Sequence, residues 1–281
     1  MTRIVPLTFV TVAVLSLGSL SAVAEEMPQS GVYTIPEVKP ARKRLWWGDW
    51  YLKVGAASVL APAYNGSNNY KFSAQPLVSF GHQGEVERFS SRNDNVSFAI
   101  IDTDCFRAGA TGKLLFKRDT NIDGIHTTRF GGEAGGFVDV YPADWLRFRG
   151  EARQGIRAHK GFVVDIAADA FHDVAPRIRV SAGPRATFAT KDYFKTFYGV
   201  APEEAVASGV KEYRPEGGWE SVGMGGAVAW KATSKIDTSL FGEYSRLEGP
   251  AKDSSFVKQH GSRDQFMFGV AATYHFDFSI E

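Results

Sequence analysis

The sequence predicts an all-β protein, a transmembrane antiparallel up-and-down β-barrel of about 12 strands. From residue 50 onward, apolar and polar residues alternate with a period of two in segments of about ten residues. After residue 24, no run of 18 apolar residues occurs, which excludes a membrane-spanning helix. A closed barrel is the other structure that satisfies its backbone hydrogen bonds inside a bilayer.

The first 24 residues have the pattern of a secretory signal peptide. Arg3 supplies a basic start, residues 4 to 20 are mostly apolar, and Ala22 and Ala24 are the small residues that a signal peptidase recognises. The apolar run is interrupted by proline and serine and is followed by two acidic residues, which is atypical of a retained anchor. We therefore expect export and cleavage after Ala24.

Residues 25 to 48 are predicted to form a periplasmic extension, and residues 49 to 281 the barrel. The prolines Pro28, Pro36 and Pro40 oppose regular secondary structure in the extension. With an even number of strands, both ends of a barrel lie in the periplasm. The predicted order is therefore signal peptide, periplasmic extension and barrel.

The clearest alternation occurs in residues 145 to 158. One face is mostly apolar, with Leu146, Phe148, Gly150, Ala152, Ile156 and Ala158. The other face is charged, with Arg147, Arg149, Glu151, Arg153 and Arg157. A helix would scatter these arginines around its axis, so the segment is a predicted strand with one face toward lipid and one toward a lumen. By the same alternation, arginine should be tolerated better at Val163 than at Ile166.

Twelve predicted strands follow when this pattern is traced along the chain. They cover residues 50–61, 70–80, 85–91, 96–101, 105–117, 127–140, 145–158, 161–171, 176–189, 218–231, 235–247 and 265–276. Short and long connections alternate, which is typical of short periplasmic turns and longer extracellular loops. The third and fourth strands have the weakest pattern, and merging them would give 10 strands.

Tryptophans gather near the predicted strand ends. Those at the predicted periplasmic end are Trp46, Trp47, Trp50, Trp145 and Trp230, and Trp219 lies at the opposite end. Tryptophan prefers the boundary between lipid and water, so these positions favour an interfacial aromatic girdle over ordinary core residues.

Charged residues line the predicted lumen. The candidate binding residues are Arg147, Arg149, Arg153, Arg157, Arg177, Arg179 and Arg185. The acidic residues that face them are Glu133, Asp139, Glu151, Asp165, Asp169, Asp237 and Glu243. Opposite charges on adjacent strands pair across a sheet, which favours a charge network that fills the lumen. A pathway for an anionic solute is the alternative.

The sequence predicts no enzymatic activity, no cofactor and no metal site. No Gly-x-Ser-x-Gly motif occurs, and the six histidines are isolated on turns, loops or strand ends. The single cysteine, Cys105, cannot form an internal disulfide or a cysteine-based metal site. The net charge of +1 gives no electrostatic footprint for nucleic acid.

Several motifs resemble those of the MltA-interacting protein (MipA)/OmpV family. They are Gly66-Ser67 with Tyr70 and Pro76, Lys191-Asp192-Tyr193-Phe194 with Phe197-Tyr198-Gly199-Val200, Ala207-Ser208-Gly209, Tyr244-Ser245-Arg246-Leu247, Ala251-Lys252-Asp253-Ser254 and Tyr274-His275-Phe276. The chain departs from the family pattern at Ser254-Ser255, where Ser-Pro is usual, and it continues past the usual aromatic terminus as residues 277 to 281.

This resemblance implies an outer-membrane barrel of a Gram-negative bacterium. For the founding member it implies a scaffold that links a lytic transglycosylase and a penicillin-binding synthase in peptidoglycan growth. We therefore expect a scaffold or structural role, with outer-membrane lipid and periplasmic murein enzymes as partners. The alternative function is a channel or receptor for a small anionic solute.

Overall fold

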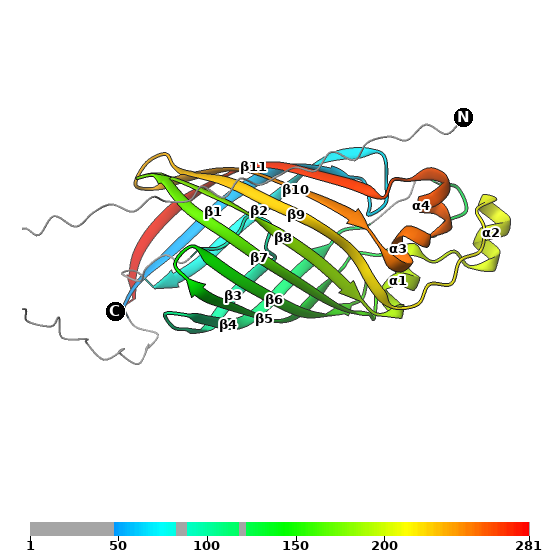
Figure 1. Ribbon diagram of the computed structural model, residues 1–281, viewed down its shortest axis with the longest axis horizontal. Helices are drawn as coiled ribbons and strands as arrows, with labels where there is room; N and C mark the ends of the chain where they lie inside the picture. The colour runs from blue at the N-terminus through cyan, green and yellow to red at the C-terminus, as the bar shows by residue number, and fades with distance from the viewer. Residues whose placement is uncertain (1–47, 83–88, 118–121, 281) are drawn as a thin grey trace, which may run out of the picture. The chain divides into compact units, whose positions relative to one another are not determined.

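The computed structural model describes residues 48–82, 89–117 and 122–280. The predicted signal peptide, almost all of the predicted extension, Trp46 and Trp47 lie outside these residues. The described chain is an antiparallel curled sheet with four short helices at one end (Figure 1). None of the described helices is long and apolar enough to cross a bilayer.

The described residues form eleven strands in one sheet, and each strand pairs with its neighbour in the chain except β2 and β3, which are the two edges of the sheet. They are β1 (Gly48–Pro62), β2 (Tyr70–His82), β3 (Val96–Asp102), β4 (Phe106–Leu115), β5 (Gly131–Ala143), β6 (Leu146–Ile156), β7 (Phe162–Ala175), β8 (Ile178–Ala189), β9 (Gly218–Lys231), β10 (Ile236–Leu247) and β11 (Asp264–Ile280). The first strand also pairs with the last, so the sheet order is β2-β1-β11-β10-β9-β8-β7-β6-β5-β4-β3. The predicted all-β, antiparallel, up-and-down fold is confirmed.

The eleven described strands are roughly consistent with the predicted count of about twelve, and the difference lies between β2 and β3. A strand was expected at residues 85–91, but residues 89–91 have no strand conformation, and residues 85–88 lie outside the described chain. Residues 89–95, here called the inner segment, instead contact side chains inside the sheet. Their serines, asparagines and aspartate favour turns over an extended ladder, which accounts for the difference.

Side chains alternate between the two faces of the wall, as the sequence pattern requires. On β9, Val222, Met224 and Val228 are exposed outward, whereas the alternate positions Gly223, Gly225 and Ala227 are less exposed. Outward apolar residues and a polar interior are what a lipid-facing barrel needs. The three described tryptophans outside β1 are Trp145, Trp219 and Trp230, and each is about half exposed at a strand end, in agreement with an interfacial girdle.

The two ends of the wall differ in their connections. At one end, short turns join the strands at residues 103–105, 144–145, 176–177 and 232–235, and we call this the short-turn end. At the other, longer connections contain the helices α1 (Lys191–Tyr198), α2 (Pro202–Ser208), α3 (Gly249–Asp253) and α4 (Ser255–His260). These helices are at most eight residues long, too short to show a helical period in the sequence.

The four helices and adjoining loops form a cap with its own apolar core. Tyr193, Phe194 and Tyr198 of α1 are buried against Phe256 and Val257 of α4. This cluster also includes Val163 of β7, which is 2% exposed. Val163 is therefore packed beneath the cap and does not face an open lumen as expected. An arginine there would be buried without a partner, so the structure removes the reason to expect better tolerance than at Ile166.

The residues beyond Phe276 extend the closing strand. In β11, Asp277 pairs with Tyr51 and Phe278 with Trp50, and the register continues to Ile280 opposite Gly48. Although these residues depart from the family pattern, they add four residue pairs to the β1–β11 ladder.

We expect Ile166→Arg to impair folding, because Ile166 is 47% exposed on the outer face of β7. An arginine facing lipid near the midplane costs about 2 to 4 kcal/mol. The matched control is Lys53→Arg, which keeps a cation inside the wall next to Asp237. Urea unfolding in lipid vesicles measures both variants, and equal losses of stability would contradict the assignment of the two faces.

Candidate functional site

A network of buried ion pairs fills the middle of the lumen. Strand β6 supplies Arg147, Arg149 and Arg153 at alternate positions, because residues two apart on a strand face the same side. Arg149 donates from Nη1 to both carboxylate oxygens of Asp139, at 3.0 Å each, and from Nε to Glu151 at 2.7 Å. These side chains are at most 4% exposed, so the charges are held by each other and not by water.

Further ion pairs extend the network toward the cap. Arg153 donates from Nε to Glu133 at 2.8 Å, and from its other two nitrogens to Glu151 and Asp165. His159 lies within 3.0 Å of Glu133 through its Nε2 atom and contacts the rings of the cap edge-on. The charged interior is therefore continuous with the apolar core of the cap.

The inner segment, where part of a wall strand was expected, contributes a further carboxylate to the network. Asp94 accepts hydrogen bonds from Arg147 at 2.6 and 3.0 Å, and Arg147 also donates to Asp169. Arg185 of β8 donates to Asp169 at 2.7 Å and to Asp94 at 3.4 Å. Asp94 thus sits between two arginines of different strands, and its side chain is 3% exposed.

Other residues of the inner segment hold it against both walls. Asn95 donates to Glu151 at 2.8 Å, and Asn93 donates to Glu243 of β10 at 3.0 Å. The ring of Phe89 stacks on Phe171 with centroids 4.2 Å apart. Gly225 makes room for this arrangement, because a Cβ atom there would lie 2.6 Å from Arg185 and 3.2 Å from Asn93.

The central network carries more negative than positive charge. It comprises Arg147, Arg149, Arg153, Arg185, Asp94, Glu133, Asp139, Glu151, Asp165 and Asp169. Four guanidinium groups therefore face six carboxylates, and Arg107 adds a fifth guanidinium at the edge, 4.0 Å from Asp139 and 3.2 Å from Asp102. Lys113 and Glu243 line an adjacent small cavity and add one charge of each sign. This balance does not provide the positive interior that an anion pathway requires.

A buried carboxylate joins the cap to the wall. Glu220 of β9 accepts hydrogen bonds from the hydroxyls of Tyr193 at 2.8 Å and Tyr198 at 2.7 Å, and from the amide of Asn65 at 3.0 Å. Burial and the neighbouring Glu220 carboxylate raise the pKa of the Tyr193 phenol well above its usual range. The phenol therefore stays protonated and keeps its bond to Glu220.

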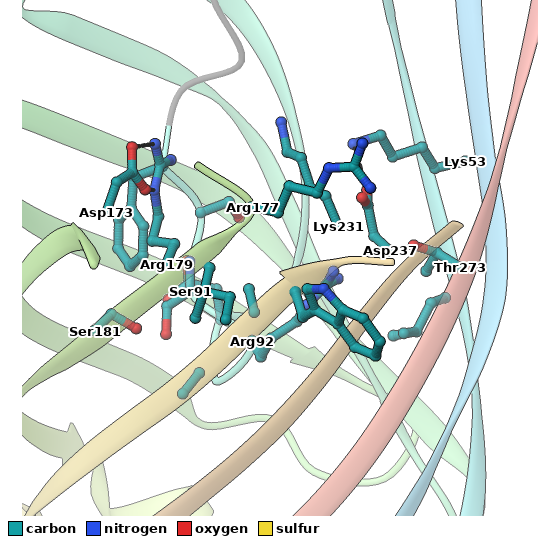
Figure 2. A pocket seen from close by; sticks show the side chains of 18 of the residues that line it. Lys53, Ser91, Arg92, Asp173, Arg177, Arg179, Ser181, Lys231, Asp237 and Thr273 are labelled. Carbon is teal, nitrogen blue, oxygen red and sulfur yellow. Dashed lines mark hydrogen bonds and ion pairs between the residues drawn. The ribbon is translucent and has the colours of Figure 1, made fainter. Parts of the chain in front are cut away.

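A second polar site lies at the short-turn end, and we call it the mouth pocket. Its volume is about 330 Å³, and Figure 2 shows ten of its lining residues by label, among them Arg177, Lys231 and Lys53. The charged lining residues are Lys53, Arg92, Asp94, Asp173, Arg177, Arg179, Lys231 and Asp237. Arg179 donates to both oxygens of Asp173, at 2.6 and 2.9 Å, and Lys53 lies 3.1 Å from Asp237.

The seven candidate arginines fall into three groups. Arg147, Arg149, Arg153 and Arg185 belong to the central network, and Arg177 and Arg179 line the mouth pocket. Arg157 is exposed just after β6, with a left-handed φ of 69° that ends the strand. It therefore does not lie in the lumen, and the binding role of the other six stays a prediction.

The seven acidic residues that the sequence predicted to face the lumen do point inward. All seven have inward contacts with cations or polar groups. Sequence reasoning missed Asp94, His159 and Lys53. Asp94 lies in a polar run that resembles any solvated loop, and only its charge hinted at arginine partners. Among the described residues, no group of three His, Cys, Asp or Glu side chains is arranged to hold a metal ion.

Comparison with solved structures finds other outer-membrane proteins at low identity. The outer membrane channel DcaP of Acinetobacter baumannii is 8% identical, with a TM-score of 0.38, over 81% of this chain and 96% of that one. The NanC porin is 8% identical, with a TM-score of 0.39, over 81% and 98% of the two chains. A bacterial polysaccharide outer membrane secretin is 9% identical, with a TM-score of 0.40, over 82% and 98%.

The family match is more specific than these loose structural likenesses. No curated protein sequence matches the chain. A model of the family described as MltA-interacting protein MipA matches residues 54–276, which include most of every described strand. Together with an apolar outer face and a polar interior, this match places the protein in the outer membrane. The chain therefore belongs to the MltA-interacting protein MipA family of outer-membrane β-barrel proteins.

Proposed function

We propose that this protein is a non-conducting barrel that serves as an outer-membrane scaffold for periplasmic murein enzymes, and that it is not an enzyme itself. The observation that carries the proposal is the filled lumen. Arg147 and Asp94 join the wall to the inner segment in the middle of the barrel, and both side chains are at most 3% exposed. A solute pathway through this point would have to break several buried ion pairs.

The cap is a second obstruction of the lumen, in addition to the central network, and it lies at the end opposite the short turns. Its helices pack on Val163 and Leu247 of the wall, and Glu220 ties α1 to β9 through two tyrosine hydroxyls. Both the apolar core and these buried hydrogen bonds would oppose an opening at this end. The two closures together favour a structural role over the alternative anion channel.

Conductance separates the two functions. Because the central network and the cap both obstruct the lumen, we expect refolded protein in planar bilayers to give no channel steps above the lipid baseline. A porin reconstituted in the same way provides the positive control. Regular anion-selective conductance steps from the unmodified protein would show that the lumen is open and would contradict the proposal of a non-conducting barrel.

Stability tests whether the network holds the barrel together. Arg149→Gln leaves Asp139 and Glu151 without their shared cation, and breaking a buried pair costs about 3 to 5 kcal/mol. We expect a lower urea midpoint for this variant. The matched control, Arg214→Gln, removes an arginine whose side chain is 78% exposed, and its midpoint should hardly move.

The scaffold role draws on the family and on the two ends of the barrel. The matching family is described by its interaction with MltA, a murein transglycosylase. We propose that the short-turn end faces the periplasm, because such barrels carry short turns on that side. Residues 25 to 48 and these turns would then be the surfaces available to periplasmic enzymes.

Binding of a purified MltA-type transglycosylase tests this role. We expect the refolded barrel to bind it in a biolayer interferometry assay, and deletion of residues 26–44 to weaken binding at least tenfold. A control variant, Val206→Ser, changes an 89% exposed residue of α2 at the opposite end and should bind normally. Unchanged binding after the deletion would remove the extension from the interface, and no binding by the intact barrel would contradict the scaffold role.

A further inference from the structure

The two edges of the sheet, β2 and β3, leave a seam in the wall. Neighbouring strands are antiparallel and the described chain has eleven of them, so β2 and β3 run in the same direction. They therefore cannot complete the antiparallel ladder, and no strand of the described residues pairs with the free edge of either. Both edges line the mouth pocket, β2 through Leu77 and Val78 and β3 through Val96 and Ser97. The mouth pocket therefore lies at this seam.

Both strands have features that suit a free edge. Pro76 lies within β2, and a free edge tolerates proline because its nitrogen has no hydrogen to donate. Strand β3 has seven residues, and its register with β4 shifts between Ala99 and Ile101. Short strands and irregular registers are among the devices that keep an edge from pairing further. The seam is therefore a property of the sequences of β2 and β3.

The mouth pocket has an apolar lining on the outer face of the wall and a polar lining inside it. Val78 and Val96 are on the outer face, 59% and 68% exposed, whereas Lys53 and Ser91 are buried inside. Free strand edges are tolerated at membrane depth only where they line a cavity or are covered by protein. We propose that the mouth pocket opens sideways into the bilayer through this seam and binds one phospholipid with a zwitterionic head group.

The charges of the pocket favour a head group that carries both signs. Arg179 donates to Asp173 at 2.6 and 2.9 Å, and Lys53 lies 3.1 Å from Asp237 (Figure 2). These cations and carboxylates are already paired with each other. A head group with one phosphate and one amine can contact such pairs and still leave no net charge in the pocket, whereas a head group of one sign would leave an unbalanced charge.

Arg177 is suitably placed for the phosphate. It lies in the β7–β8 turn, it lines the mouth pocket, and its side chain makes no ion pair or hydrogen bond with the described part of the chain. A guanidinium group can bind two oxygens of a phosphate at once. The carboxylate of Asp173, whose side chain is 58% exposed, is accessible to the amine.

The size of the pocket places only the head group inside the wall. A volume of about 330 Å³ is at the low end of the range for small-molecule sites, which is about 300 to 1,000 Å³. The hydrocarbon chains would remain outside, against the apolar outer face beside the seam. Phe72 of β2 and Phe98 of β3 extend this face and are 76% and 50% exposed. The lipid would thus cover the seam from the side of the bilayer.

Native mass spectrometry of the refolded mature protein tests the proposal. The detergent-solubilised barrel is incubated with phosphatidylethanolamine, with phosphatidylglycerol, or with glycerophosphoethanolamine, which has the first lipid's head group but no chains. We expect one phosphatidylethanolamine to be retained per barrel. The head group alone should bind about tenfold more weakly, because it lacks the apolar contact outside the wall. Phosphatidylglycerol should also bind more weakly, because it lacks the amine.

Substitutions at the seam should weaken binding of the lipid. In Val78→Trp and in Val96→Trp, a large ring takes the place of a hydrocarbon chain, and the affinity should fall about tenfold in each. The matched control, Val222→Trp, makes the same change on the outer face of β9, where Val222 is 45% exposed, and its affinity should stay within twofold. The urea midpoint of each variant shows whether it is folded.

A second pair of variants tests the head group. Arg177→Gln should weaken binding of the lipid, whereas Arg214→Gln removes an exposed cation beyond the pocket and should leave binding unchanged. The proposal is overturned if no phosphatidylethanolamine is retained, or if Val222→Trp weakens binding as much as both seam variants do.

The other probes separate this site from different kinds of site. Equal affinity for the head group alone would show a pocket for a water-soluble ligand and would contradict entry through the seam. Equal affinity for phosphatidylglycerol would contradict the zwitterionic head group. Transglycosylase binding measured on the same variants should not change, because the lipid site is independent of the scaffold role.

Discussion

Arginine-carboxylate pairing inside the wall is the interaction on which the rest of this barrel depends. Arg147, Arg149 and Arg153 stand on one face of β6, and each bridges to carboxylates on neighbouring strands. Buried charges of this kind contribute little net stability over an apolar core, but leaving one unpaired is very costly. The pairs therefore fix which strand lies beside which and in what register.

The same pairing explains how the inner segment is held. A run of serine, asparagine and aspartate has little hydrophobic reason to enter a barrel. Asp94 nevertheless offers the carboxylate that Arg147 and Arg185 need, and the asparagines on either side bind Glu243 and Glu151. Without this segment, two guanidinium groups would lose a partner in a poorly hydrated space. The strands of the wall and the inner segment are thus held together by the same ion pairs.

Much of the wall could be predicted from the sequence, because alternation of apolar and polar residues shows which side of a strand faces lipid and which faces the lumen. The bounds of β9 agree with the predicted residues 218–231, and the charged face of β6 was identified correctly. Alternation shows which face a residue is on but not how far along the barrel axis it lies. Arg179 was therefore grouped with Arg149, although Arg179 lines the mouth pocket at the short-turn end and Arg149 lies in the central network.

Other features left little or no record in the sequence. The inner segment has the composition of any solvated loop, so nothing in its pattern showed that it folds inward. The cap depends on contacts between loops that are far apart in the chain, such as Tyr198 with Phe256. Arg157 was predicted to continue β6, but its left-handed backbone ends the strand, and alternation alone cannot signal that change.

The long β11 strand has a consequence for how the barrel reaches its final shape. Its ladder with β1 joins residues more than 200 positions apart, such as Gly48 and Ile280, so this pairing has the largest loop-closure cost of any in the wall. Contacts of such high sequence separation form slowly. Residues 277–280 add four pairs to this one ladder. These pairs stabilise the β1–β11 contact once it has formed, and they therefore oppose its separation.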